Sequence, residues 1–306
     1  MRRRRLCALL LLCAAPLLAA AGRQPLPPPG IAATAPEAAS GQVPGGLDDL
    51  LVLPGTWVEV RYAPETLDRA ARLQERLEAL VQLWKPLTRA PLAWKGAAVD
   101  RARWGRLAPG WPWGLPVRIA GPTFVVPAQG DAETVATAAW LLGGAPPDPG
   151  GDPVLGSRGE AGSLVVCDLL LQVEAARAFV GANHLAGDEP WVTGVLVQLA
   201  ARYAWESAEP GRMLEVVGLF DRMAAAHGGA AAGRLADYRG GLPFDTDLWY
   251  QAQFVRGADA IWVAEGRRGT GRRLSRWIDA GKPLRRADLE KKYPALLDWQ
   301  RAAFAP

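Results

Sequence analysis

LLLQVEAARAF, at residues 169–179, is an apolar stretch that carries one carboxylate, Glu174, and one cation, Arg177. A second apolar stretch, PWVTGVLVQLAARY, follows at residues 190–203. Because Glu174 and Arg177 are three residues apart, they lie on the same face of any helix that contains them. The fold of the second half of the chain, and any site in it, therefore depends on how these two stretches pack.

The two stretches are predicted to form an antiparallel pair of helices, over residues 168–183 and 190–206. Gly187 can end the first helix and Pro190 can start the second, because glycine suits a helix C-terminus and proline the first helical turn. The short link between them is typical of two helices that pack against each other. Glu174 and Arg177 are expected near their contact.

The residues before this pair predict a small sheet with one long helix. TWVEVRYA, at 56–63, alternates apolar and polar residues as a half-buried strand does. An amphipathic helix is expected to begin at Pro64, and two short strands are expected within 115–128. GSLVVC, at 162–167, is either a further strand or the buried start of the next helix.

The residues after the pair predict only helices. These are expected at residues 211–227, 246–265, 270–280 and 286–303. An α/β part (55–167) followed by a helical part (168–306) places the chain in the α+β class. Both parts are expected to belong to one region that spans residues 51–306.

The first 21 residues, MRRRRLCALLLLCAAPLLAAA, are typical of a secretory signal peptide. Their apolar run is shorter than the ~20 residues that a membrane-spanning helix needs. Residues 22–50 are rich in proline, alanine and glycine, which predicts a disordered tether. We expect an exported protein, periplasmic or extracellular, that is either free or tethered to a membrane by an uncleaved signal.

The charge balance argues against nucleic acid as a partner. The chain has 35 Lys and Arg and 31 Asp and Glu, but four of the arginines belong to the signal segment, so the remainder is neutral. Binding to phosphates needs a surplus of basic residues. Cys167 is the only cysteine beyond the signal, so no cysteine zinc cluster is expected, and no nucleotide-binding motif points to a cofactor.

Tryptophan is concentrated in residues 92–114, which contain four of them. Trp111 and Trp113 flank a proline, and on a loop stiffened in this way they are candidates to stack on the sugar rings of a cell-wall ligand. The alternative is that this loop packs its aromatic side chains against the sheet, the commoner use of tryptophan.

The two central stretches and the order of the elements resemble the gluzincin (peptidase MA-like) metallopeptidases. Those proteins carry H-E-x-x-H on one helix, with two zinc-binding histidines and a glutamate as general base, and a third ligand on the next helix. VEAARAF (173–179) stands where HExxHAF is expected, and PWVTGVLVQLAARY (190–203) where PxWLxEGxAxY is. The resemblance implies a gluzincin-like fold with Glu174 in the general-base position.

All three zinc-ligand positions differ from that pattern, because they hold Val173, Arg177 and Gly194. Valine has no lone pair, and a guanidinium would repel a zinc ion. The resemblance therefore implies a metal-free relative, a pseudoenzyme without zinc.

Glu174 and Arg177 have three roles open to them. They can form an ion pair that holds two helices together, or Arg177 can bind the carboxylate or phosphate of a ligand in the vacated cleft. In the third role Glu174 is a general base that works without metal. His184 lies near acidic residues in the link, where it is either a solvated side chain or part of a weak metal site.

Residues 266–292 are strongly basic, with ten Lys and Arg against three acidic residues. Arg272, Arg273 and Arg276 are predicted on one side of a helix, as candidates for peripheral contact with an anionic surface. A solvated helix face is the alternative.

These observations favour an exported, non-catalytic, peptidase-like protein that binds a ligand or an envelope partner. One alternative is a metal-independent hydrolase or carbohydrate-acting enzyme that uses carboxylates such as Glu174, Glu206 and Asp168. The other alternative is a structural component of the envelope. Whether the protein is an enzyme is left open by the sequence, with the non-catalytic interpretation favoured.

The signal segment generates the first prediction. We expect the exported protein to be cleaved after Ala21, because small residues occupy the positions that signal peptidase reads. Intact mass measurement of protein recovered from the envelope should show a chain that begins at Gly22. Recovery of protein that still carries Met1 to Ala21 would contradict it.

Overall fold

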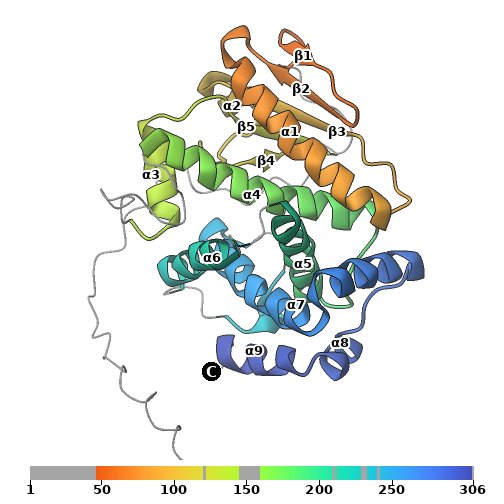
Figure 1. Ribbon diagram of the computed structural model, residues 1–306. Helices are drawn as coiled ribbons and strands as arrows, with labels where there is room; N and C mark the ends of the chain where they lie inside the picture. The colour runs from red at the N-terminus through yellow and green to blue at the C-terminus, as the bar shows by residue number, and fades with distance from the viewer. Residues whose placement is uncertain are drawn as a thin grey trace, which may run out of the picture.

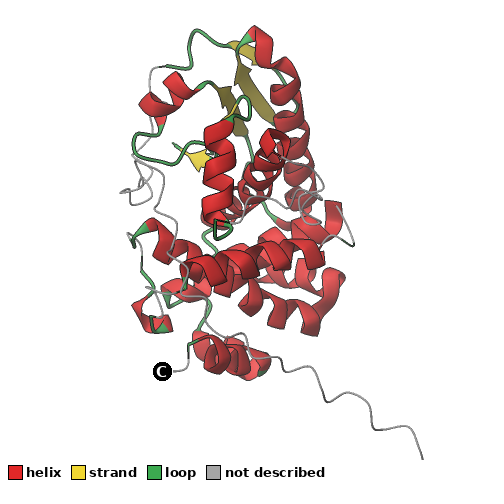
Figure 2. Ribbon diagram, turned by 90° about the vertical axis from the view of Figure 1, so that its left-hand side faces the viewer, coloured by secondary structure: helices red, strands yellow, loops and turns green. Residues whose placement is uncertain are grey.

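The computed structural model describes residues 46–119, 122–144, 159–208, 211, 213–228, 233–239 and 242–304. The predicted signal and most of the predicted tether lie outside these residues. Figure 1 shows a sheet at one end of the molecule and helices at the other, with helix α4 (Gly159–Ala182) running across the middle. Figure 2, turned by 90°, shows the same separation. The α+β class predicted from the sequence is confirmed.

Five strands form one mixed sheet in the order β1-β2-β3-β5-β4. They are β1 (Leu51–Leu53), β2 (Val58–Tyr62), β3 (Trp94–Val99), β4 (Val117–Arg118) and β5 (Thr123–Pro127). The central strands β2, β3 and β5 are parallel, and each edge strand is antiparallel to its neighbour. The short edge strand β4 carries Arg118 at its end.

Helices cover both faces of the sheet. They are α1 (Leu67–Trp84), with single 3-10 turns at Pro64–Thr66 and Lys85–Leu87, and α2 (Arg101–Leu107). Helix α3 (Ala132–Leu141) packs against α4 instead. Alternate strand residues such as Val58 and Val60 pack against α1, whereas Ala97 and Val125 point to the other face, where α2 lies. The period-two alternation of a strand thus separates two apolar clusters.

The second half of the described chain is helical. Its elements are α4 (Gly159–Ala182), α5 (Pro190–Ala208), α6 (Met213–His227), a 3-10 turn (Leu235–Asp237), α7 (Phe244–Ala280), α8 (Arg286–Lys292) and α9 (Ala295–Ala303). Helix α5 is buried on nearly every side, between α4, α6 and α7. A helix that is apolar all round belongs in a core.

The predicted packing of α4 against α5 is confirmed, but their predicted antiparallel arrangement is wrong. Figure 1 shows the two axes crossing at an angle. The reason is that α5 has apolar residues on all sides and packs most extensively against α7. Its direction is therefore set by several neighbours and not by α4 alone.

Three other segments differ from the sequence prediction or decide between its alternatives. Residues 162–167 are part of α4, so the helical alternative holds for GSLVVC. The tryptophan-rich residues 92–114 are not a continuous loop, because they form β3 and α2. Helix α7 is interrupted only at Gly266, whose φ of 63° lies in the left-handed region. The two helices predicted at 246–265 and 270–280 are the two segments of α7, and they meet at this break.

The packed part of the chain also begins earlier than the predicted boundary at residue 51. Leu47 and Leu50 are 2 % and 7 % exposed and belong to the cluster on the α2 face of the sheet. The Arg61 guanidinium donates to the Leu47 carbonyl at 2.9 Å. The last residues of the predicted tether are thus part of the fold.

A buried ion pair connects the sheet layer with the helical half. Arg69 of α1 donates to both carboxylate oxygens of Asp168 in α4, at 2.7 and 3.1 Å. Its Nε also donates to the Pro127 carbonyl at the end of β5, at 3.3 Å. Arg69 is only 3 % exposed. Because a buried guanidinium loses its hydration, it depends on these partners.

This ion pair generates the second prediction. Asp168→Asn should lower the free energy of unfolding by about 3 kcal/mol, because it leaves the Arg69 charge buried without its counter-charge. Denaturant titration followed by circular dichroism would measure the change.

Asp298→Asn is the matched control, because it removes the carboxylate of a solvent-exposed pair with Arg301. It should change stability by less than about 1 kcal/mol. Equal losses of stability in the two variants would show that the Arg69–Asp168 pair does not stabilise the contact between the sheet layer and the helical half.

Candidate functional site

A pocket of about 500 Å³ lies beside the end of α4 and the start of α5. Its walls come from both helices, from the link between them, from the edge strand β4 and from Tyr238. Arg118, Arg177 and His184 line it together with the apolar side chains of Val180, Leu185 and Val197. The predicted site residue Arg177 is thus part of an accessible cavity.

Nearby carboxylates stabilise the charge of Arg177. Its Nε donates to Glu174 on the same helix at 3.4 Å. Burial alone would lower the pKa of Arg177, but the charges of Glu174 and of Asp247 on α7 outweigh burial and raise that pKa. The side chain is still 31 % exposed. The Arg177 side chain is therefore held in place by its carboxylate neighbours and still exposes part of its surface to the pocket.

Arg118 brings a second positive charge into the same pocket. Its guanidinium has no hydrogen bond or ion pair with any residue that the structure describes. Burial and repulsion by Arg177 lower the pKa of Arg118, against the attraction of Glu174. An arginine stays charged at neutral pH even so. The pocket thus contains a cation whose charge is not compensated by a direct partner.

A hydrogen-bond network borders the pocket at Tyr238. The Gln251 amide donates to the Tyr238 hydroxyl at 2.9 Å and to Asp247 at 3.4 Å, and receives a bond from Gln198 at 3.1 Å. Burial and the charge of Asp247 raise the pKa of Tyr238 to about 12, and burial also raises the pKa of Asp247. The Tyr238 hydroxyl is therefore protonated at neutral pH and can act as a donor.

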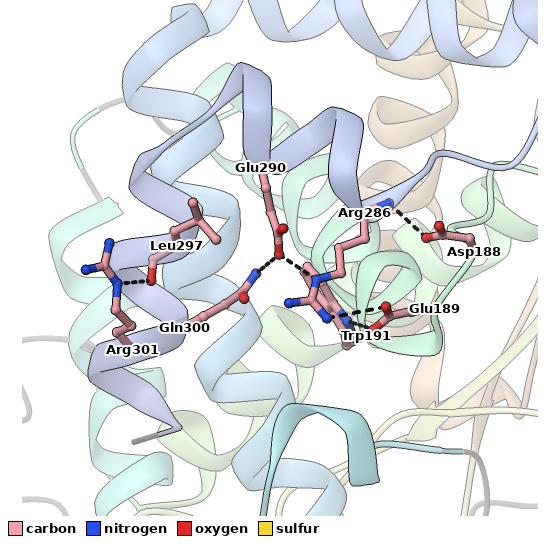
Figure 3. Close-up of polar contacts among 8 residues, drawn as sticks. All are labelled: Asp188, Glu189, Trp191, Arg286, Glu290, Leu297, Gln300 and Arg301. Carbon is pink, nitrogen blue, oxygen red and sulfur yellow. Dashed lines mark hydrogen bonds and ion pairs between the residues drawn. The ribbon is translucent and has the colours of Figure 1, made fainter. Parts of the chain in front are cut away.

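The rim of the pocket is attached to the C-terminal helices. Leu284 donates its amide to the Ala186 carbonyl at 2.8 Å and accepts from the Asp188 amide at 3.0 Å, which forms a short parallel bridge. The Arg286 amide donates to the Asp188 carboxylate at 2.9 Å (Figure 3). His184, at a φ of 50°, lies in this rim. The link between α4 and α5 is therefore fixed by main-chain bonds.

The Arg286 side chain strengthens the same attachment. Figure 3 shows its guanidinium between Glu290 and Glu189, at 2.6 and 3.5 Å, beside the ring of Trp191. Gln300 of α9 donates to Glu290 at 2.9 Å. Helices α8 and α9 are thus connected through one arginine to the first turn of α5.

Two of the three positions expected for zinc ligands are occupied by residues that packing requires. Val173 is 5 % exposed and belongs to the main apolar cluster. At Gly194, any Cβ would lie 2.5 Å from the Phe254 ring of α7, so a larger side chain does not fit without a shift of that ring. Among the residues that the structure describes, no group of three or more potential ligand side chains is placed to hold a metal ion.

The tryptophans singled out from the sequence lie elsewhere. Trp113 is 5 % exposed and donates to Asp131 at 2.9 Å. Trp111 is half-buried, donates to the Pro116 carbonyl at 3.2 Å and packs edge-on against Phe244. Neither is among the described residues that line the pocket. Their contacts are those of packing residues.

The remaining candidate carboxylates are each engaged with an arginine in a different part of the fold. Asp168 pairs with Arg69, as described above. Glu206 lies 3.8 Å from Arg202, which also pairs with Asp259. None of the three candidate carboxylates, Glu174, Glu206 and Asp168, is among the described residues that line the pocket.

Sequence reasoning missed Arg118, Tyr238 and Asp247. Arg118 carried a signal that could have been used, because it is a lone charge within the apolar segment LPVRIAG. Tyr238 and Asp247 had no such signal, since they lie in a loop and at the start of α7.

No known family model matches this chain, and no curated protein or solved structure is significantly similar to it. Among the described helices, none is both long and apolar enough to cross a membrane.

The close approach at Gly194 generates the third prediction. Gly194→Ala should lower the free energy of unfolding by about 1–3 kcal/mol, because its methyl group collides with Phe254. Gly218→Ala in α6 is the control, because a Cβ there meets no atom within 4 Å. It should stabilise the protein by about 0.5–1 kcal/mol. Thermal unfolding of both variants tests the pair, and a neutral Gly194→Ala would show that α5 and α7 are loosely packed.

Proposed function

We propose that the protein is a non-catalytic binding protein whose pocket between α4 and α5 holds a small ligand with a carboxylate or phosphate group. The observation that carries this proposal is the pair Arg118 and Arg177, two guanidinium groups that line one cavity. One of them, Arg118, forms no ion pair or hydrogen bond with a described residue and is only attracted by Glu174 at longer range. An anion that reaches both would relieve their mutual repulsion.

The position of the nearby carboxylates supports an anionic ligand over a cationic one. Glu174 and Asp247 influence Arg177 electrostatically, but neither lines the cavity. A ligand therefore meets the guanidinium groups and not the carboxylates. Guanidinium groups bind carboxylate and phosphate oxygens through paired, charge-assisted hydrogen bonds.

The rest of the pocket supports a ligand with an apolar part. Val180, Leu185 and Val197 contribute hydrocarbon surface. Pockets for small molecules commonly combine apolar walls with a few polar groups that fix orientation. The volume of about 500 Å³ suits a small molecule.

The resemblance to gluzincins belongs to the same proposal. Arg177 occupies the position of the expected second histidine and lines the pocket. Exchange of a neutral zinc ligand for a permanent cation would turn a metal site into an anion site. Export to the periplasm or the cell exterior is also part of the proposal, and would place the ligand among envelope or nutrient molecules.

The fourth prediction tests this pocket with two probes, inorganic phosphate and hexanoate, in isothermal titration calorimetry. Arg118→Met and Arg177→Met should each weaken binding of the better probe by about 10- to 100-fold, since a hydrogen bond to a charged group contributes roughly 1.5–3 kcal/mol. Arg101→Met is the control, because Arg101 is an exposed arginine paired with Glu133. It should leave the affinity unchanged.

Glu174→Gln separates the binding role from a catalytic one. Because Glu174 competes with the ligand for Arg177, its neutralisation should strengthen binding of the anion. If Glu174 were instead a general base, the parent protein would show turnover and this variant would lose it. Absence of binding for both probes, or equal loss in the Arg101 control, would refute the proposed site.

A further inference from the structure

A stripe of exposed arginines follows the outer side of the second segment of α7. Arg268, Arg272 and Arg276 are spaced by four residues, so they lie on one side of the helix over about 12 Å. All three are exposed, and none has a hydrogen bond or an ion pair with a residue that the structure describes. This segment lies at the right-hand edge of Figure 1, away from the sheet.

The predicted basic face differs from this stripe in one residue. Arg273 was expected beside Arg272 and Arg276, but it turns inward and donates to Glu265 at 3.0 and 3.2 Å. Glu265 also accepts from Tyr293 and pairs with Lys292. Arg273 therefore stabilises the contact of α7 with the segment after α8 and does not belong to the exposed face.

The stripe contrasts with three exposed arginines that are paired, although isolated exposed arginines such as Arg89 also have no partner among the described residues. Arg256, Arg285 and Arg301 each lie within 3.0 Å of a carboxylate oxygen. Like charges four residues apart on a helix destabilise it by a few tenths of a kcal/mol per pair. Between Gly266 and Ala280 the only carboxylate is Asp279. The fold thus maintains a positive helix face on a chain whose formal charge beyond residue 21 is zero.

An exposed apolar residue precedes this stripe by a few residues along the chain. Val263 is 76 % exposed, more than any other large exposed hydrophobic residue in the described chain. It lies before the stripe in α7, and the break at Gly266 separates the two. Basic side chains next to an exposed apolar one are the combination that binds the interface of an anionic membrane, where headgroups meet acyl chains.

We propose that this arginine stripe, Arg268, Arg272 and Arg276, docks the protein on a membrane surface that contains anionic lipid. The arginines bind lipid phosphates, and Val263 enters the headgroup layer. This contact is peripheral and independent of the pocket between α4 and α5. It brings the protein to the membrane surface through charge.

The fifth prediction tests this docking by co-sedimentation of the full protein with vesicles. The protein should bind vesicles of phosphatidylcholine with phosphatidylglycerol and not vesicles of phosphatidylcholine alone. Replacement of all three stripe arginines by glutamine should weaken binding roughly a hundredfold, from about 1 kcal/mol per basic residue. Added salt should weaken binding of the parent protein in the same way.

The control variant replaces Arg101, Arg256 and Arg301 by glutamine. It removes the same charge from arginines that already have acidic partners, and it should bind the anionic vesicles like the parent. Val263→Ser should weaken binding without changing its salt dependence. Circular dichroism establishes that each variant is folded.

Three results would overturn the proposal. The first is equal binding of the parent protein to anionic and neutral vesicles. The second is equal loss of binding in the stripe variant and the control variant. The third is binding to a soluble polyanion such as heparin with no binding to anionic vesicles, which would assign the stripe to a polyanionic partner.

Discussion

The ion pair between Arg69 and Asp168 fixes the two halves of this protein to each other. Arg69 belongs to the helix that covers the sheet, and Asp168 belongs to the first helix of the helical half. A third contact, to the Pro127 carbonyl, includes the end of a central strand. The neighbouring Cys167 is fully buried, and burial raises its pKa to about 12, so the thiol adds no charge to this cluster at neutral pH. These contacts therefore fix the positions of the sheet, α1 and α4 relative to one another.

That position creates the pocket. Because α4 is fixed against the sheet, its later turns pass the edge strand β4, and Arg177 faces the same cavity as Arg118. Neither residue alone would define a site. An arginine with a glutamate three residues earlier is a common helix pair, and an arginine on an edge strand is a common surface residue. Their shared cavity, with the carboxylates outside it, gives the pocket its positive character.

The sequence predicted the elements better than it predicted the site. Long apolar runs bounded by Gly187 and Pro190 were enough to place the end of α4 and the start of α5, but α4 begins at Gly159, nine residues before the predicted start. Their crossing was not predictable, because a helix that is apolar all round does not indicate which neighbour it follows. The strand and the helix within the tryptophan-rich segment were missed because glycine and proline there favoured a loop.

The same limit applies to the candidate site. The sequence shows that the three expected zinc-ligand positions hold residues that cannot bind zinc. It does not show why Gly194 is a glycine, because the Phe254 ring that leaves no room for a side chain there is 60 residues away along the chain. Arg177 was found because it interrupts an apolar helix. Arg118 and Tyr238 come from a short strand and a loop, and only the tertiary fold brings them to Arg177.

The attachment of the pocket rim through Arg286 has a thermodynamic consequence. The residues between α4 and α5 line the pocket and also contact Leu284 and Arg286. Arg286 is in turn connected to α9 through Glu290 and Gln300. The stability of the pocket rim and the docking of the C-terminal helices are therefore coupled. A ligand that fixes the rim strengthens the docking of the C-terminal helices by the same amount by which their docking favours the ligand. If the pocket binds a ligand as proposed, its occupancy would be detectable as slower amide exchange in helices that the ligand does not touch.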